Sequence, residues 1–86
     1  MAYAVFGGLH FRTCQANPRK IEWCQSVPAW QTDPHEFEAE IIGLEVYEGR
    51  LWAILSNRKC YTRAGWNAWN VYNVDSGHYI YKAYFT

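Results

Sequence analysis

The 86-residue sequence has no net charge and no long apolar run. Eight Lys and Arg residues balance eight Asp and Glu residues, so the chain lacks the positive excess typical of nonspecific nucleic-acid or membrane-surface binders. The longest apolar candidate, Leu51 to Leu55, is far shorter than the roughly 18 residues that a membrane-spanning helix needs. We therefore expect no membrane association.

Motifs for catalysis and for cofactors are also missing. The sequence contains no Gly-rich phosphate loop, no Gly-x-Ser-x-Gly and no His-Glu-x-x-His. Among its cysteines and histidines, only His10 and Cys14 approach the spacing of paired zinc ligands. We expect a non-enzymatic protein without a metal or cofactor.

Cysteine is scarce and odd in number, with Cys14, Cys24 and Cys60 as the three copies. The start Met1-Ala2-Tyr3 shows neither the basic nor the apolar region of a secretory signal. These features favour a cytoplasmic protein with buried free thiols.

Aromatic residues are abundant, with seven Tyr, five Trp and four Phe. A chain of this length forms one thin core, and each aromatic side chain buries on the order of 150 to 250 Å². We expect a single domain over residues 1–86. Because Tyr and Trp suit contact surfaces, we also expect some of them to be exposed.

Charge is unevenly distributed along the chain. Residues 33–48 carry six acids and no base, whereas residues 49–86 carry five bases against one acid. The acidic run is expected to be a solvated face. As an alternative, Glu38, Glu40 and Glu45 on one strand could imitate the phosphates of a nucleic acid.

Short β-type segments separated by turn residues dominate the pattern. Alternation and β-forming residues predict strands over residues 2–6, 9–14, 21–25, 41–46, 51–55 and 60–62. Gly7 and Gly8 indicate a hairpin or a bulged strand, Gly49 suits a tight hairpin turn, and a bulge at Gly43 would restore alternation. A C-terminal hairpin is predicted from residues 69–74 and 78–85 around Gly77.

Residues 34–40 fit two structures. Asp33, Pro34 and Glu36 match a helix start, while Phe37, Ala39 and Ile41 alternate as in a strand. We therefore predict a mainly β fold, in which a small antiparallel sheet curls into a partly open barrel or a sandwich, with room for one short helix near residues 34–40.

Bases and large aromatic residues interleave between residues 58 and 72, which makes this stretch the candidate contact surface. Trp, Tyr and Arg are the side chains most enriched at interface hot spots. The candidate partner-binding residues are Arg58, Lys59, Tyr61, Arg63, Trp66, Trp69 and Tyr72.

The preferred hypothesis is a protein-binding module that occupies a site on a larger protein, for example a phage or mobile-element inhibitor of a host enzyme or defence complex. The alternative is a small β-barrel nucleic-acid-binding module, in which these bases follow phosphates while the aromatics stack on bases. An exposed edge strand would also permit a homodimer.

Overall fold

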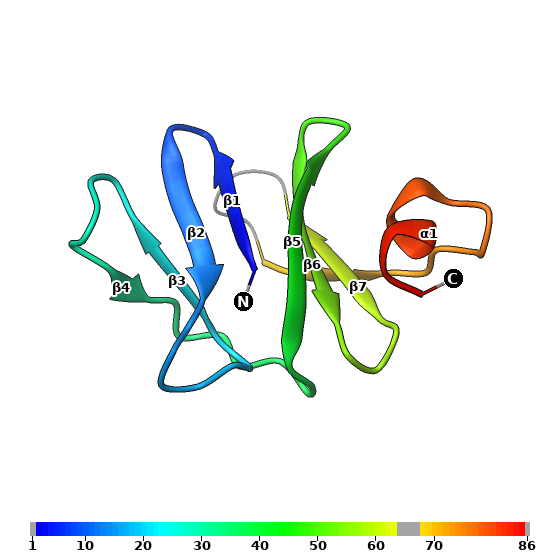
Figure 1. Cartoon of the computed structure of the whole chain (residues 1–86), viewed down its shortest axis with the longest axis horizontal. Coiled ribbons are helices and arrows are strands. Elements are labelled where there is room, and N and C mark those ends of the chain that lie inside the picture. The colour runs from blue at the N-terminus through cyan, green and yellow to red at the C-terminus, as the bar shows by residue number, and fades with distance from the viewer. Residues whose placement is uncertain (1, 64–67, 86) are drawn as a thin grey trace.

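The computed structural model describes residues 2–63 and 68–85, and it shows a mainly β protein (Figure 1). Two antiparallel four-stranded sheets are present, and they are not closed into a barrel. The first contains, in order, β1 (Tyr3–Phe6), β2 (Leu9–Thr13), β3 (Ile21–Cys24) and β4 (Gln31–Thr32). The second contains β5 (Ile41–Tyr47), β6 (Arg50–Leu55), β7 (Cys60–Arg63) and β8 (Asn70–Tyr72), and helix α1 (Tyr79–Phe85) follows it. The predicted fold class is confirmed.

Two tight turns set the register of the main hairpins. Gly7 and Gly8 have φ angles of 59° and 76°, and Phe6 pairs with Leu9. Glu48 and Gly49 have φ angles of 53° and 70°, so this two-residue turn joins β5 to β6. Positive φ at both central positions matches the right-handed twist of paired strands. The hairpin predicted at Gly49 is therefore confirmed, and at Gly7 and Gly8 the structure has a hairpin and not a bulged strand.

The inner faces of both sheets share one hydrophobic core. Phe11 and Ile21 come from the first sheet, and Leu51, Ala53 and Leu55 come from β6 in the second. Trp52 and Ile54 alternate with the β6 residues on the opposite face, which packs against α1. Strand β6 is thus covered on both sides, which explains its unbroken apolar run.

The helix expected near residues 34–40 is absent. Instead, the Phe37 N–H donates to the carbonyl of Arg19 at 2.9 Å, and the Ile41 N–H donates to the carbonyl of Pro18 at 2.9 Å. Phe37 itself is buried in the shared core. Because these backbone groups have partners in a distant loop, the segment runs between the sheets without forming helical turns.

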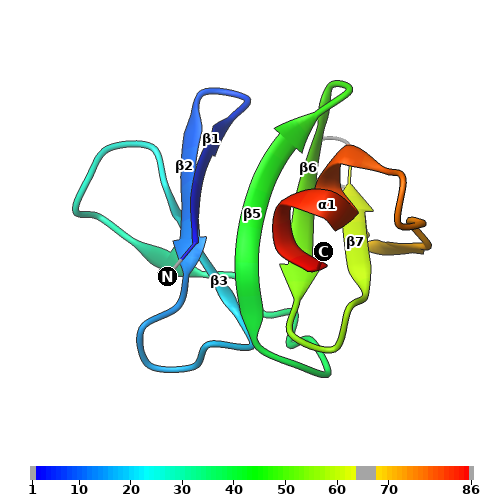
Figure 2. The same ribbon diagram turned by 45° about the vertical axis from the view of Figure 1, so that its right-hand side comes forward.

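The prediction of a second strand in a C-terminal hairpin is wrong, because residues 79–85 form the helix α1. Its buried Ile80 packs against Ile54 and Cys60, with Tyr84 and Phe85 beside it. Residues 80 and 84 share one face of a helix. In a strand, the alternation of Tyr79, Tyr81 and Phe85 on one face had fitted equally well. Figure 2 shows α1 lying across the second sheet, over β6 and β7.

The predicted bulge near Gly43 is confirmed by a register shift between Ile41 and Gly43. Gly43 lies directly beneath the Tyr84 ring, where a Cβ atom would come within 2.5 Å of the phenolic oxygen. Glycine at this position lets α1 approach the sheet. In the part of the chain that the structure describes, no helix is long and apolar enough to span a membrane.

Candidate binding pocket beside helix α1

Strand register places two rows of side chains on the outer face of the second sheet. Trp52 is paired with Thr62, which is paired with Asn70. In the next row, Ile54 is paired with Cys60, which is paired with Tyr72. Helix α1 packs on Ile54 and Cys60, whereas the Trp52 row lies toward the Glu48–Gly49 turn. The outer face is therefore only partly covered by the helix.

A pocket of about 250 Å³ opens over the Trp52 row. It spans β6, β7 and β8 and reaches the residue that precedes α1. Its lining residues are Glu48, Arg50, Trp52, Thr62, Asn70, Val71, Tyr72 and His78. We call this feature the outer-face pocket.

Aromatic rings form the base and walls of the outer-face pocket. Trp52 is only 3% exposed, and its Nε1–H donates to the carbonyl of Tyr47 at 2.9 Å. The Tyr72 ring meets Trp52 edge-on at 5.0 Å between centroids, and the His78 ring lies 6.1 Å from Trp52. Tyr47 meets the His78 ring edge-on at 5.5 Å between centroids and stacks on Tyr79. These ring contacts hold the pocket wall in place without closing it.

The polar groups of the pocket carry opposite charges. Arg50 and Glu48 flank Gly49, and within residues 2–63 and 68–85 neither side chain has a hydrogen bond or an ion pair. His78 accepts a hydrogen bond at Nδ1 from the Ile80 N–H at 3.2 Å. In the neutral ring, the proton is then on Nε2. The pocket can therefore both donate and accept hydrogen bonds.

Strand β8 forms the edge of the second sheet and one side of the pocket. All three of its residues are exposed, and Val71 and Tyr72 remain 54% and 47% exposed. An edge strand presents backbone N–H and C=O groups that can pair with another chain. Large apolar side chains on such an edge are typical of an interaction surface.

The structure disperses the candidate contact residues that were predicted from the sequence. Of the members that it describes, Tyr72 lies in the outer-face pocket. Arg58 is exposed, but it donates to the hydroxyl of Tyr81 at 3.0 Å and lies 5.6 Å from the Phe85 ring. Arg58 therefore contacts α1.

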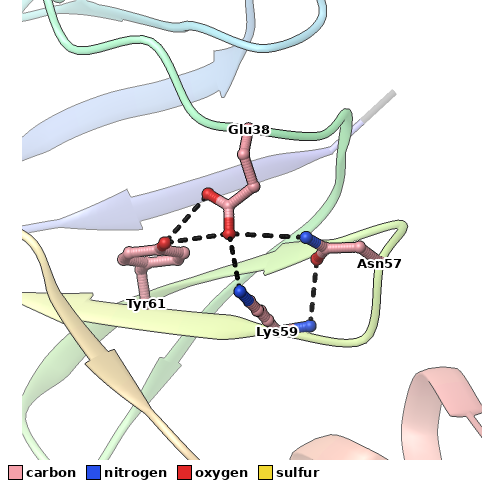
Figure 3. Close-up of polar contacts among 4 residues, drawn as sticks. All are labelled: Glu38, Asn57, Lys59 and Tyr61. Atoms are coloured by element: carbon pink, nitrogen blue, oxygen red, sulfur yellow. Dashed lines mark hydrogen bonds and ion pairs between the residues drawn. The ribbon is translucent and has the colours of Figure 1, made fainter.

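Lys59 and Tyr61 belong to a polar cluster around Glu38 (Figure 3). The Tyr61 hydroxyl donates to the carboxylate at 2.8 Å, and the Lys59 ammonium lies 3.5 Å from it. Desolvation works to raise the pKa of Glu38, but hydrogen bonds from its backbone, Tyr61 and Asn57, with the charge of Lys59, together lower that pKa. Burial and the bond to Glu38 raise the pKa of Tyr61. This cluster links the segment between the sheets to β7.

Arg63 and Trp69 point inward. Arg63 is 5% exposed, lies 3.4 Å from the Asp33 carboxylate and stacks 4.6 Å above the Trp69 ring. Trp69 packs edge-on against Phe37 in the shared core. Burial lowers the pKa of the Arg63 guanidinium, and the charge of Asp33 partly offsets this effect. Trp66 lies outside the described residues.

Sequence reasoning missed most of the pocket. Arg50 and Trp52 are two residues apart on one strand, so alternation alone places them on the same face. The position of His78 was hidden by the wrong strand prediction for residues 78–85. Asn70 and Thr62 join the Trp52 row only through the registers of β7 and β8, which depend on how three strands pair.

Within the described residues, no group of three or more metal-ligating side chains comes together. Cys14, Cys24 and Cys60 are buried free thiols, and burial raises the pKa of Cys60. Comparisons with family models, with curated proteins and with solved structures found no match to this chain.

Proposed function

We propose that this protein is a non-enzymatic protein-binding module that contacts its partner through the outer-face pocket and the edge of β8. The observation that carries the proposal is the open aromatic pocket directly beside an edge strand with exposed Val71 and Tyr72. A partner segment that adds to the edge gains backbone hydrogen bonds, while the pocket receives one of its side chains.

The size of the pocket supports a protein partner over a small molecule. Sites for cofactors and drug-sized ligands usually enclose roughly 300 to 1,000 Å³, whereas the outer-face pocket encloses about 250 Å³. This is room for one large side chain. Tyr72, Trp52 and Arg50 are also of the residue types that dominate binding energy at protein interfaces.

The nucleic-acid alternative gains no support from the geometry. Arg58, Lys59 and Arg63, which were expected to follow phosphates, contact Tyr81, Glu38 and Asp33 within the protein. Exchanging these internal contacts for phosphates would forfeit part of the binding energy.

A site-specific photocrosslinker tests the proposal. A benzophenone side chain replaces Val71, at the pocket edge, or Val5, a control of matched 52% exposure on the first sheet. In extracts of the cells that produce the protein, we expect Val71 to crosslink to one protein that Val5 does not reach. Tyr72→Ala, which alters an exposed side chain, should remove at least nine-tenths of that product.

Equal products from the two positions, or a product that survives Tyr72→Ala, would overturn the proposal. A crosslink only to a second copy would identify the face as a dimer interface instead. If the captured protein is an enzyme, its activity with and without saturating amounts of this chain tests whether binding inhibits it.

A further inference from the structure

We propose that the outer-face pocket receives a tyrosine side chain of the partner. This inference rests on the proposed function and names the chemistry that the pocket selects. It follows from three properties of the pocket: aromatic walls, a volume suited to one side chain, and a pair of opposite charges that do not neutralise each other directly.

The walls favour a planar aromatic side chain. Trp52 and Tyr72 stand nearly perpendicular to each other, with 86° between their ring planes, and His78 lies beside both. A ring that enters the pocket and lies against this aromatic group can stack on one ring and meet another edge-on, which are the arrangements that aromatic pairs prefer. A linear aliphatic chain would gain burial but not these ring contacts.

The charges favour a neutral ligand with a polar tip. A lone carboxylate would be attracted by Arg50 but repelled by Glu48, and a lone ammonium would experience the reverse. A phenol hydroxyl can accept a hydrogen bond from the Arg50 guanidinium and donate one to the Glu48 carboxylate. Phenylalanine would fill nearly the same volume but can make neither of these hydrogen bonds.

The edge of β8 explains how such a side chain could be delivered. Strands in a sheet lie about 4.8 Å apart, and alternate side chains point to the same face. A partner strand beside β8 therefore presents every second residue on the outer face, in line with the row formed by Trp52, Thr62 and Asn70. The tyrosine would extend this row and turn into the pocket.

Small amino-acid amides test the inference without knowledge of the partner. The ¹⁵N-labelled protein is titrated with N-acetyl-tyrosinamide and N-acetyl-phenylalaninamide, and amide and indole shifts are followed by NMR. We expect saturable shifts at Trp52, Asn70 and Tyr72 with the tyrosine compound. The phenylalanine compound should bind about fivefold more weakly, the ratio expected for one net hydrogen bond.

Arg50→Met gives the sharpest readout because it keeps the length of the side chain and removes the charge. The substitution should lower the affinity for N-acetyl-tyrosinamide about fivefold and leave the affinity for N-acetyl-phenylalaninamide unchanged. Lys20→Met, which removes a positive charge from the loop between β2 and β3 in the first sheet, is the control and should change neither affinity.

Several results would overturn the inference: no shift at the solubility limit, shifts outside the pocket, or equal affinity for the two compounds. Binding of the cationic N-acetyl-lysinamide, or of the α-amide of N-acetyl-aspartic acid, that is tighter than binding of N-acetyl-tyrosinamide would also overturn the inference. If neither amide binds in the pocket but the crosslink from position 71 depends on Tyr72, only the tyrosine inference is contradicted. If the amides bind but Val71 captures no partner, the proposed function falls.

Discussion

Tyr84 of α1 makes two close contacts with strand β5, and these contacts change the pKa of its hydroxyl. Its hydroxyl donates a 2.5 Å hydrogen bond to the half-buried Glu45 carboxylate, and its ring lies over Gly43. Burial, followed by the bond to Glu45, raises the pKa of Tyr84 well above its ordinary value. One side chain therefore couples α1 to β5 through both packing and charge.

This coupling predicts a change in stability at alkaline pH. The unfolded chain releases the Tyr84 proton near pH 10.0 while the folded chain retains it, so the stabilisation is complete below pH 10.0 and is lost as the pH rises further. Tyr84→Phe should cost about 1 kcal/mol at pH 7. It should also flatten the fall in stability above pH 10, as measured by urea unfolding between pH 7 and 11.

Tyr61 provides the comparison for this measurement. Its pKa is also raised, but its hydroxyl lies at the surface beside Glu38. Tyr61→Phe should therefore change the alkaline slope less than Tyr84→Phe does. A Tyr84→Phe protein with the wild-type slope would contradict the assignment.

At the scale of elements, the contact between α1 and the second sheet is set by the smallest residue in β5. Gly43 is paired with Ile54, which packs against Ile80 of α1. The Tyr84 ring occupies the space that a side chain at position 43 would need. The Tyr84 ring of α1 therefore packs directly on the bulged segment of β5.

Gly43→Ala should destabilise the protein by about 1 to 3 kcal/mol, the usual range for overpacking a filled site. The added methyl group must push the Tyr84 ring away and weaken its bond to Glu45. In a Tyr84→Ala background, the same substitution should cost much less, because the obstructing ring is gone. A double-mutant cycle by thermal unfolding measures this difference.

A cycle with no coupling between positions 43 and 84 would contradict this packing. Lys82→Ala, on the exposed side of the same helix, serves as the control and should show no coupling with Gly43→Ala.

At the scale of the whole molecule, the segment between the sheets is held to the core at both ends. Asp33 pairs with the buried Arg63 of β7 at its start, and Phe37 is buried in the shared core. The N–H of Ser56 donates to the carbonyl of Glu40 at its end. These contacts join the two sheets in the absence of a closed barrel.

Asp33→Asn should destabilise the protein by about 3 kcal/mol, because it removes the carboxylate that lies 3.4 Å from the buried Arg63 guanidinium. Glu36→Gln is the matched control. It makes the same change of charge three residues away, where Glu36 and Arg19 are nearly half exposed, and should cost under about 0.5 kcal/mol. Urea unfolding of both variants checks the comparison, and equal costs would contradict it.

The strand pattern was predictable wherever neighbouring residues determine it. Glycines at the two tight turns, alternation in β2 and β5, and the apolar run of β6 all act over a few residues, so they could be found from the sequence. The candidate site was harder to predict. Arg63 and Trp69 look like contact residues in sequence, yet they pair with each other and with Asp33 in the interior.

The amino-acid sequence by itself determined that this protein is a small, mainly β, aromatic-rich chain with hairpins at Gly7–Gly8 and Glu48–Gly49. Only the tertiary structure decided that residues 34–40 are not helical and that residues 79–85 are. Both segments could adopt either conformation locally, and partners distant in sequence selected one. The same long-range pairing created the outer-face pocket, because Trp52, Thr62 and Asn70 meet only across three strands.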